Sequence, residues 1–185
     1  MVKGKVTKFI VVYGCDNTGK STACENLNNI FKQYGIFSEV VHSCGPVSPI
    51  EQIAFMEEQT ETNPNVEVKI FDRFPAIEEA VCGKVLRNVN KLHPYKKQCN
   101  EFIQRISLFI HCNPPHSIVE NWGTREQMEG IKENYKKLIK GYKNIGNYFP
   151  LINNRKEEYD WTQSHEEGLY KILWKRGFLN EHYTC

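Results

Sequence analysis

Short apolar runs alternate along the chain with longer stretches in which apolar residues recur at helical spacing. The apolar runs are rich in β-branched residues, which favours buried strands. Strands are predicted at residues 5–14, 36–43, 66–71, 106–112 and 147–152. Helices are predicted at residues 20–34, 48–60, 76–105 with a break near Pro94, 126–144 and 162–177.

Strands that alternate with helices predict a parallel sheet that is covered by helices on both faces. With right-handed crossovers, this pattern predicts a doubly wound α/β sheet of five strands. No repeat or low-complexity linker interrupts the pattern, so residues 1–185 are predicted to form a single domain. Ligands of such sheets bind at the carboxyl ends of the strands, and candidate chemistry is therefore sought there.

The composition argues against nucleic-acid-binding, membrane and disulfide-bonded proteins. The 185 residues carry a net charge of +2, which predicts no overall electrostatic attraction to nucleic acid or membranes. The seven cysteines are odd in number and form no Cys-x-x-Cys pair, so we expect free thiols and a cytoplasmic location. His111, Cys112 and His116 have metal-ligand chemistry, but packing at a strand end explains them better than zinc. No apolar run approaches membrane-spanning length.

A glycine-rich loop lies between the first predicted strand and the first predicted helix. Residues 14–21, GCDNTGKS, match the P-loop (Walker A) pattern G-x-x-x-x-G-K-[ST]. Glycines let backbone N–H groups converge on phosphate oxygens, and the helix N-terminus adds its dipole. In such a loop Lys20 reaches the β- and γ-phosphates and the Ser21 hydroxyl binds Mg²⁺. The sequence therefore predicts a nucleoside-triphosphate site.

Asp16 stands inside this loop, where the pattern does not require a carboxylate. A carboxylate beside a triphosphate is electrostatically costly unless it faces a cation or a hydroxyl donor. Three roles fit: a water-mediated contact to Mg²⁺, a hydrogen bond from a sugar hydroxyl of a second substrate, or an Asx turn within the loop.

Asp72 and Arg73 follow the third predicted strand, which is expected beside the first. A carboxylate at that place binds the metal of a P-loop site, in the manner of a Walker B residue. The forked guanidinium of Arg73 suits a phosphate group. A surface ion pair between the two residues is the alternative interpretation.

Together these motifs resemble the thymidylate kinase family. The family's loop reads G-x-[DE]-x-x-G-K-S-T, matched by residues 14–22, and its motif D-R-[FHY] is matched by residues 72–74. The proline pair that opens the family's lid is matched by HCNPP, and the late motif I-D-A-x-Q-S by YDWTQS at residues 159–164. The match runs in order over nearly the whole chain, and it most resembles the compact versions encoded by phages.

The resemblance implies a P-loop nucleoside monophosphate kinase fold with a lid near residues 114–130, and a cytoplasmic homodimer, which would lie in the host cytoplasm if the protein is encoded by a phage. It implies transfer of the γ-phosphoryl group of ATP, with Mg²⁺, to dTMP or to a related or modified deoxynucleoside monophosphate. Asp16 would hold the sugar 3′-hydroxyl of the acceptor, Arg73 would clamp its phosphate, and Arg125 would be the lid arginine.

The expected site residues fall into four groups. The catalytic residues are Lys20, Asp72, Arg73 and Arg125, and the metal residues are Ser21 and Asp72. The ATP-binding residues are Gly14, Asn17, Thr18, Gly19, Lys20, Ser21, Thr22 and Trp161. The acceptor-binding residues are Asp16, Arg73, Phe74, Glu78 and Val81. The chain departs from the family at Val81 and Cys82, and no arginine precedes Arg73 to read thymine.

A hydroxyl acceptor, either a deoxynucleoside or a hydroxymethylated base within DNA, is the alternative. A hydroxyl nucleophile needs a general base, whereas a monophosphate arrives ionised and needs only positioning cations. The segment VVHSCGPVSP after the second predicted strand carries no carboxylate, which favours the monophosphate. In the alternative, Asp72 would be the base, and the lysines around Tyr95 in NKLHPYKK would meet a DNA strand.

Overall fold

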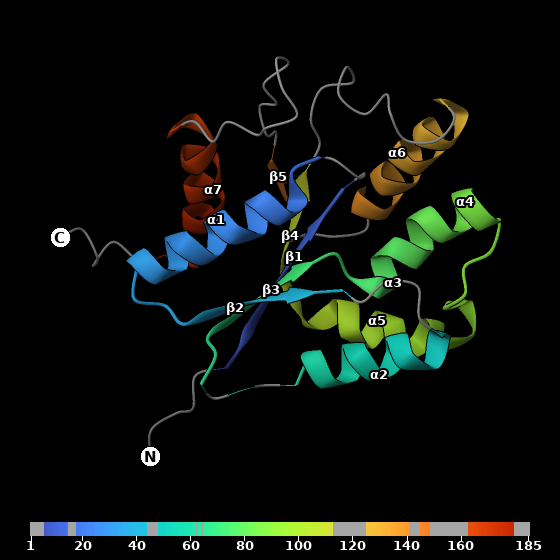
Figure 1. The fold of residues 1–185 in the computed structure, drawn as a ribbon, viewed down its shortest axis with the longest axis horizontal. Helices are drawn as coiled ribbons and strands as arrows, with labels where there is room; N and C mark the ends of the chain where they lie inside the picture. The colour runs from blue at the N-terminus through green and yellow to red at the C-terminus, as the bar shows by residue number, and fades with distance from the viewer. Residues whose placement is uncertain are drawn as a thin grey trace.

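The computed structural model describes residues 6–14, 18–43, 48–61, 63, 65–112, 125–140, 145–148 and 163–179. Five strands form one parallel sheet in the order β2–β3–β1–β4–β5 (Figure 1). The strands are β1 (Lys8–Tyr13), β2 (Ser38–His42), β3 (Val68–Asp72), β4 (Ile106–Cys112) and β5 (Ile145–Tyr148). The first strand therefore lies at the centre of the sheet, with β3 beside it as the sequence predicts.

Helical segments connect these strands. The α-helices are α1 (Lys20–Gln33), α2 (Pro49–Gln59), α3 (Pro75–Glu78), α4 (Lys84–Arg87), α5 (Lys96–Arg105), α6 (Arg125–Lys140) and α7 (Gln163–Lys175). A π-helical turn, η1 (Glu79–Gly83), joins α3 to α4, and a 3₁₀ turn, η2 (His93–Tyr95), precedes α5. Ser48 caps α2 in a capping box with Glu51, which explains why the helix begins at Pro49.

Helices cover both faces of the sheet, as predicted (Figure 1). Side chains of a strand alternate between faces, and β1 shows this directly. Phe9, Val11 and Tyr13 join the core under α2, α3, α5 and α6, while Ile10 and Val12 join the core under α1 and α7. Because both faces of β1 are buried, its sequence is a continuous apolar run rather than an alternating one.

Two predicted boundaries differ from the structure. The helical stretch 76–105 is interrupted first at Asn88, a left-handed residue that ends α4, and only then at the η2 turn around Pro94. The fifth strand lies at Ile145–Tyr148, earlier than the predicted 147–152, because residues 145–148 pair with Phe109–Cys112 of β4. A Cβ at Gly146 would lie 2.6 Å from Ile172 of α7, so glycine permits this close packing.

The cysteines that the structure describes, Cys24, Cys82, Cys99 and Cys112, are free thiols, as predicted. Burial raises the pKa of Cys112 to about 12 and also raises the pKa of Cys24. Both therefore stay protonated at neutral pH and are poor nucleophiles. None of the described helices has the length and apolar character needed to span a membrane.

Candidate active site

The P-loop begins where β1 ends, and its backbone requires glycine at both motif positions. Gly14 has φ +154°, and a Cβ there would lie 2.4 Å from the carbonyl oxygen of Cys112 on the neighbouring strand. Gly19 is the N-cap of α1, in the left-handed conformation with φ 79° and ψ 21°. Both conformations are costly for other residues, so the two glycines set the path of the loop.

Helix α1 begins at Lys20, which is only 5% exposed. The N-cap residue of this helix is Gly19, which makes no side-chain cap, and its first turn carries no acidic residue. The start of a helix binds anions through its first N–H groups and its dipole. Thr18, which precedes Gly19, is also buried. A buried cation at a helix start with a glycine N-cap is the chemistry that a triphosphate requires.

Asp72 ends β3 directly beside the start of α1. The Ser21 hydroxyl donates a hydrogen bond of 2.6 Å to Asp72 Oδ2, and His42 Nδ1 lies 3.3 Å from the same oxygen. The other carboxylate oxygen, Oδ1, is buried and has no hydrogen-bond partner within the part of the chain that the structure describes. A buried carboxylate oxygen without a donor is costly, and such an atom commonly marks a metal or ligand contact.

These residues fit a Mg²⁺ ion. The hydroxyl of Ser21 donates its hydrogen bond to Asp72, so the lone pairs of the Ser21 oxygen remain available to a metal. Asp72 Oδ1 is an additional oxygen acceptor. Within the described ranges, no three His, Cys, Asp or Glu side chains gather as metal ligands. Mg²⁺ does not need such a cage, because it is usually held by one or two protein oxygens together with waters and substrate phosphates.

Arg73, next to Asp72, has an unusual backbone. It has φ 73°, in the left-handed region that residues with a Cβ rarely adopt. Its N–H donates a hydrogen bond of 3.0 Å to the carbonyl of Val12, which continues the sheet for one more residue. The side chain is exposed at the carboxyl end of the sheet. Strain of this kind clusters at functional sites, so it supports a role for the guanidinium.

Glu78, at the end of α3, lies within reach of the P-loop. The Tyr135 hydroxyl is 3.2 Å from Glu78 Oε1 and 3.3 Å from the carbonyl oxygen of Gly14, and the Cys82 thiol donates to Glu78 Oε2 at 3.7 Å. Tyr135 is 1% exposed and belongs to α6. A single buried hydroxyl thus links the loop, the segment after β3 and the helix that begins at Arg125.

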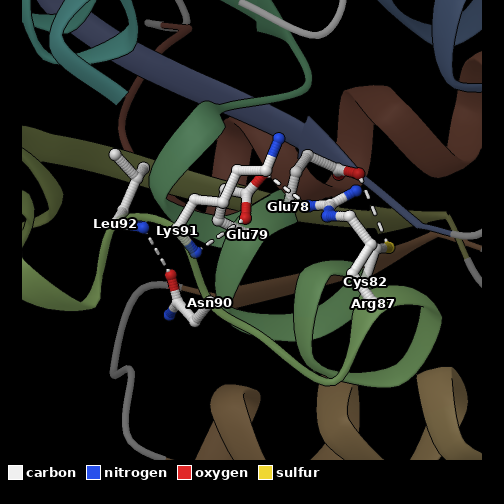
Figure 2. Close-up of polar contacts among 7 residues, drawn as sticks. All are labelled: Glu78, Glu79, Cys82, Arg87, Asn90, Lys91 and Leu92. Carbon is white, nitrogen blue, oxygen red and sulfur yellow. Dashed lines mark hydrogen bonds and ion pairs between the residues drawn. The ribbon is translucent and has the colours of Figure 1, made fainter. Parts of the chain in front are cut away.

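A second buried carboxylate, Glu79, organises the turn beyond Glu78. Figure 2 shows Arg87 and the backbone of Lys91 directed at it. Arg87 Nη2 lies 2.6 Å from Glu79 Oε1, and the Lys91 N–H donates to Oε2 at 3.2 Å. A Cβ at Gly83 would lie 2.6 Å from Glu79 Oε2 and 3.0 Å from the Arg87 guanidinium, which explains the glycine there. Sequence analysis did not predict this ion pair, because no motif pairs residues eight apart across a π-turn.

Several expected site residues occupy other surroundings or fall outside the described residues. Phe74 and Val81 are fully buried in the core, and Phe74 packs edge-on against Phe71 with ring centroids 5.2 Å apart. Their expected contact with the acceptor stays a prediction. Thr22 is half-buried in the first turn of α1. Asp16, Asn17 and Trp161, and residues 114–124 of the expected lid, lie outside the described residues, and of Arg125 only its place as the first residue of α6 is described.

His111 packs behind the loop rather than joining the site. Its ring stacks on Tyr13 with centroids 4.9 Å apart and lies 5.7 Å from the ring of Tyr135. Burial lowers the pKa of His111 to about 4, so it is neutral at physiological pH. His111 and Cys112 thus pack in β4, as expected, while His116 lies outside the described residues.

Solved structures with this arrangement of strands and helices include three kinases. Thymidylate kinase from Candida albicans matches with a TM-score of 0.58 and 12% identity, over 95% of this chain and 96% of that one. Thymidylate kinase from Ehrlichia chaffeensis matches with a TM-score of 0.59 and 14% identity, over 90% of this chain and 98% of that one. The chain has the thymidylate kinase fold.

A third structure with this fold is the deoxyadenosine kinase from M. mycoides, which was solved with its products dCMP and dCDP bound. It matches with a TM-score of 0.53 and 16% identity, over 90% of this chain and 98% of that one. No protein-family model and no curated protein matches the sequence. The thymidylate kinase fold is therefore shown by structure, at identities too low to carry over a substrate.

Proposed function

We propose that this protein is a Mg²⁺- and ATP-dependent kinase that transfers the γ-phosphoryl group to a deoxynucleoside monophosphate, giving the diphosphate. The observation that carries the proposal is the contact between Ser21 and Asp72. It joins the P-loop to the end of β3, beside the buried Lys20, and leaves one carboxylate oxygen for the metal site.

Each residue has a defined task in this proposal. Lys20 and the N–H groups at the start of α1 neutralise the β- and γ-phosphates of ATP. Ser21 binds Mg²⁺ through its oxygen lone pairs, while Asp72 accepts a hydrogen bond from the Ser21 hydroxyl and from the water ligands of the ion. Bound Mg²⁺ supplies charge neutralisation at the transferring phosphoryl group. The lid arginine Arg125 adds a second positive charge there, by resemblance.

On the acceptor side, Arg73 clamps the phosphate of the monophosphate, which attacks in its ionised form and needs no base. Asp16 holds the sugar hydroxyl, and Glu78 lines the same side through its link to the loop. Trp161 packs on adenine. We expect a cytoplasmic homodimer with a small-molecule nucleotide as its partner.

A kinase for a hydroxyl acceptor is the second candidate. The likeness to a deoxyadenosine kinase favours it, because that enzyme shares the fold. Two observations favour the monophosphate instead. No Asp or Glu lies between Glu39 and Glu51, after β2. Asp72 Oδ2, the candidate base, already accepts a hydrogen bond from the Ser21 hydroxyl.

The experiment is a panel of acceptors with γ-labelled ATP and Mg²⁺. It contains the deoxynucleoside monophosphates, the deoxynucleosides, and DNA with plain or hydroxymethylated bases, each with wild type and Lys20→Ala. Label on a diphosphate that is lost in Lys20→Ala supports the proposal. Label on a nucleoside or DNA hydroxyl would overturn the monophosphate assignment in favour of the second candidate. No Lys20-dependent transfer to any acceptor would contradict the kinase function itself.

A further inference from the structure

His42 occupies a position that the sheet itself fixes. It is the last residue of β2, and the parallel register pairs it with Asp72, the last residue of β3. The Ser43 N–H donates a hydrogen bond of 3.3 Å to the Asp72 carbonyl, which holds the two strand ends together. The place of His42 beside the proposed metal site therefore depends on regular sheet pairing rather than on a loop.

His42 Nδ1 lies 3.3 Å from Asp72 Oδ2. Because an ionised carboxylate only accepts hydrogen bonds, this contact is attractive when Nδ1 bears a proton. The Ser21 hydroxyl donates to the same oxygen at 2.6 Å. Ser21 and His42 thus approach Oδ2 from different elements, while Oδ1 is buried and has no hydrogen-bond partner among the described residues.

Exposure argues against a packing role for this histidine. The His42 side chain is 69% exposed, whereas the Asp72 side chain is 8% exposed. An imidazole in that setting contributes little to the core, and its one described polar contact is to the carboxylate of Asp72. Side chains that contact a metal-binding carboxylate commonly orient it for the metal.

We propose that His42 is a positioning residue for the metal site, whose Nδ1–H orients the Asp72 carboxylate so that Oδ1 faces Mg²⁺ or its water ligands. The inference rests on the proposed function, because the ion is the one that accompanies ATP. It assigns to β2 a part in phosphoryl transfer that the P-loop and Walker B motifs do not include.

The test measures metal affinity directly. Mn²⁺ replaces Mg²⁺, and free Mn²⁺ is followed by electron paramagnetic resonance in the presence of a non-hydrolysable ATP analogue. Four variants are compared with wild type: His42→Ala, His42→Asn, His42→Gln and, as a control, His93→Ala, which removes an exposed histidine in the η2 turn. Asn places an amide N–H near the position of Nδ1, whereas Gln places it near Nε2.

The proposal expects His42→Ala and His42→Gln to weaken Mn²⁺ binding by about tenfold, as loss of a residue that orients a metal ligand commonly does. His42→Asn and His93→Ala should bind Mn²⁺ as wild type does. In steady-state assays, His42→Ala should need more Mg²⁺ but recover the wild-type kcat at saturation, with an unchanged thermal midpoint.

Wild-type Mn²⁺ affinity in His42→Ala would overturn the inference, and so would an Asn variant as defective as the Ala variant. These outcomes leave the kinase proposal intact. That proposal fails separately if the wild type itself shows no Mn²⁺ binding that depends on the nucleotide and on Lys20.

Discussion

Arg73 has a left-handed backbone that glycine would adopt more easily, so Arg73→Gly should be more stable than Arg73→Ala although both should lose activity. For an L-residue this conformation costs about 1–2 kcal/mol, while glycine loses about 0.5–1 kcal/mol of extra conformational entropy on folding. Arg73→Gly should therefore be about 0.5–1 kcal/mol more stable than Arg73→Ala. The backbone hydrogen bond from residue 73 to Val12 is available to both variants.

The Gly–Ala comparison isolates the backbone, since both variants lack the guanidinium. The same pair of substitutions at two other positions supplies the controls. At Asn88, which has φ 54°, glycine should again be the more stable. At Lys137, an exposed residue inside α6, glycine should be less stable than alanine by about 1 kcal/mol. Denaturant unfolding measures each difference, and the Arg73 pair should differ in thermal midpoint by about 1–4 °C.

Activity should not follow stability at Arg73. If Arg73 clamps the acceptor phosphate as proposed, both variants lose that contact, so acceptor KM should rise and kcat fall together, equally in each. Arg73→Lys should recover little activity, because a point charge does not reproduce the guanidinium fork. A glycine variant less stable than the alanine variant would refute the strained backbone. Wild-type kinetics in either variant would refute the clamp.

Four further substitutions test other parts of the structure. Lys20→Ala should abolish turnover, because the β- and γ-phosphates lose their buried cation; a near-native kcat would contradict the kinase proposal. Asp72→Asn should lose activity that higher Mg²⁺ partly restores, whereas a loss independent of Mg²⁺ would identify Asp72 as a base. Arg87→Ala should lower the free energy of unfolding by about 2 kcal/mol, because it leaves the buried Glu79 carboxylate without its cation. A loss close to zero would show that the ion pair is only a surface contact. Burial lowers the pKa of His111 to about 4 in the folded state, so the unfolded state binds more protons between pH 6.5 and pH 4. The free energy of unfolding of wild type should therefore fall by about 3 kcal/mol over this range relative to that of His111→Phe. Equal pH dependence of the two proteins in urea titrations would contradict the burial of His111 as a neutral group.

The parts of the site that sequence could predict are those fixed by local backbone chemistry. Gly14, Gly19, Lys20 and Ser21 follow a spacing that only a strand–loop–helix satisfies, and the structure places all four accordingly. Asp72 was predictable because the carboxyl ends of parallel strands meet at one edge. The resemblance to thymidylate kinases is confirmed at the level of the fold, whereas the likeness to phage versions stays a prediction.

The parts that sequence could not predict depend on register and on long-range packing. His42 faces Asp72 only because residues 38 and 68 start the pairing of β2 with β3, and a shift of one residue would turn its side chain to the other face. Tyr135 reaches the Gly14 carbonyl across 121 residues of sequence. The ion pair between Glu79 and Arg87 needs a π-turn, which adds a residue that helical periodicity does not anticipate.

Three locally unfavourable features of the described structure lie at the carboxyl edge of the sheet. Gly14 passes too close to β4 for any side chain, Arg73 carries left-handed strain, and Asp72 Oδ1 is buried without a donor among the described residues. None of these helps the free protein to fold, and each is held in place by the two cores on either side of β1. Bound MgATP and an acceptor phosphate would relieve two of them, because the metal engages the buried oxygen and the phosphate engages the guanidinium. Unfavourable features that lie together at one edge are typical of a site that binds charged ligands, and they support the proposed phosphoryl transfer at the ends of β1 and β3 independently of the P-loop motif.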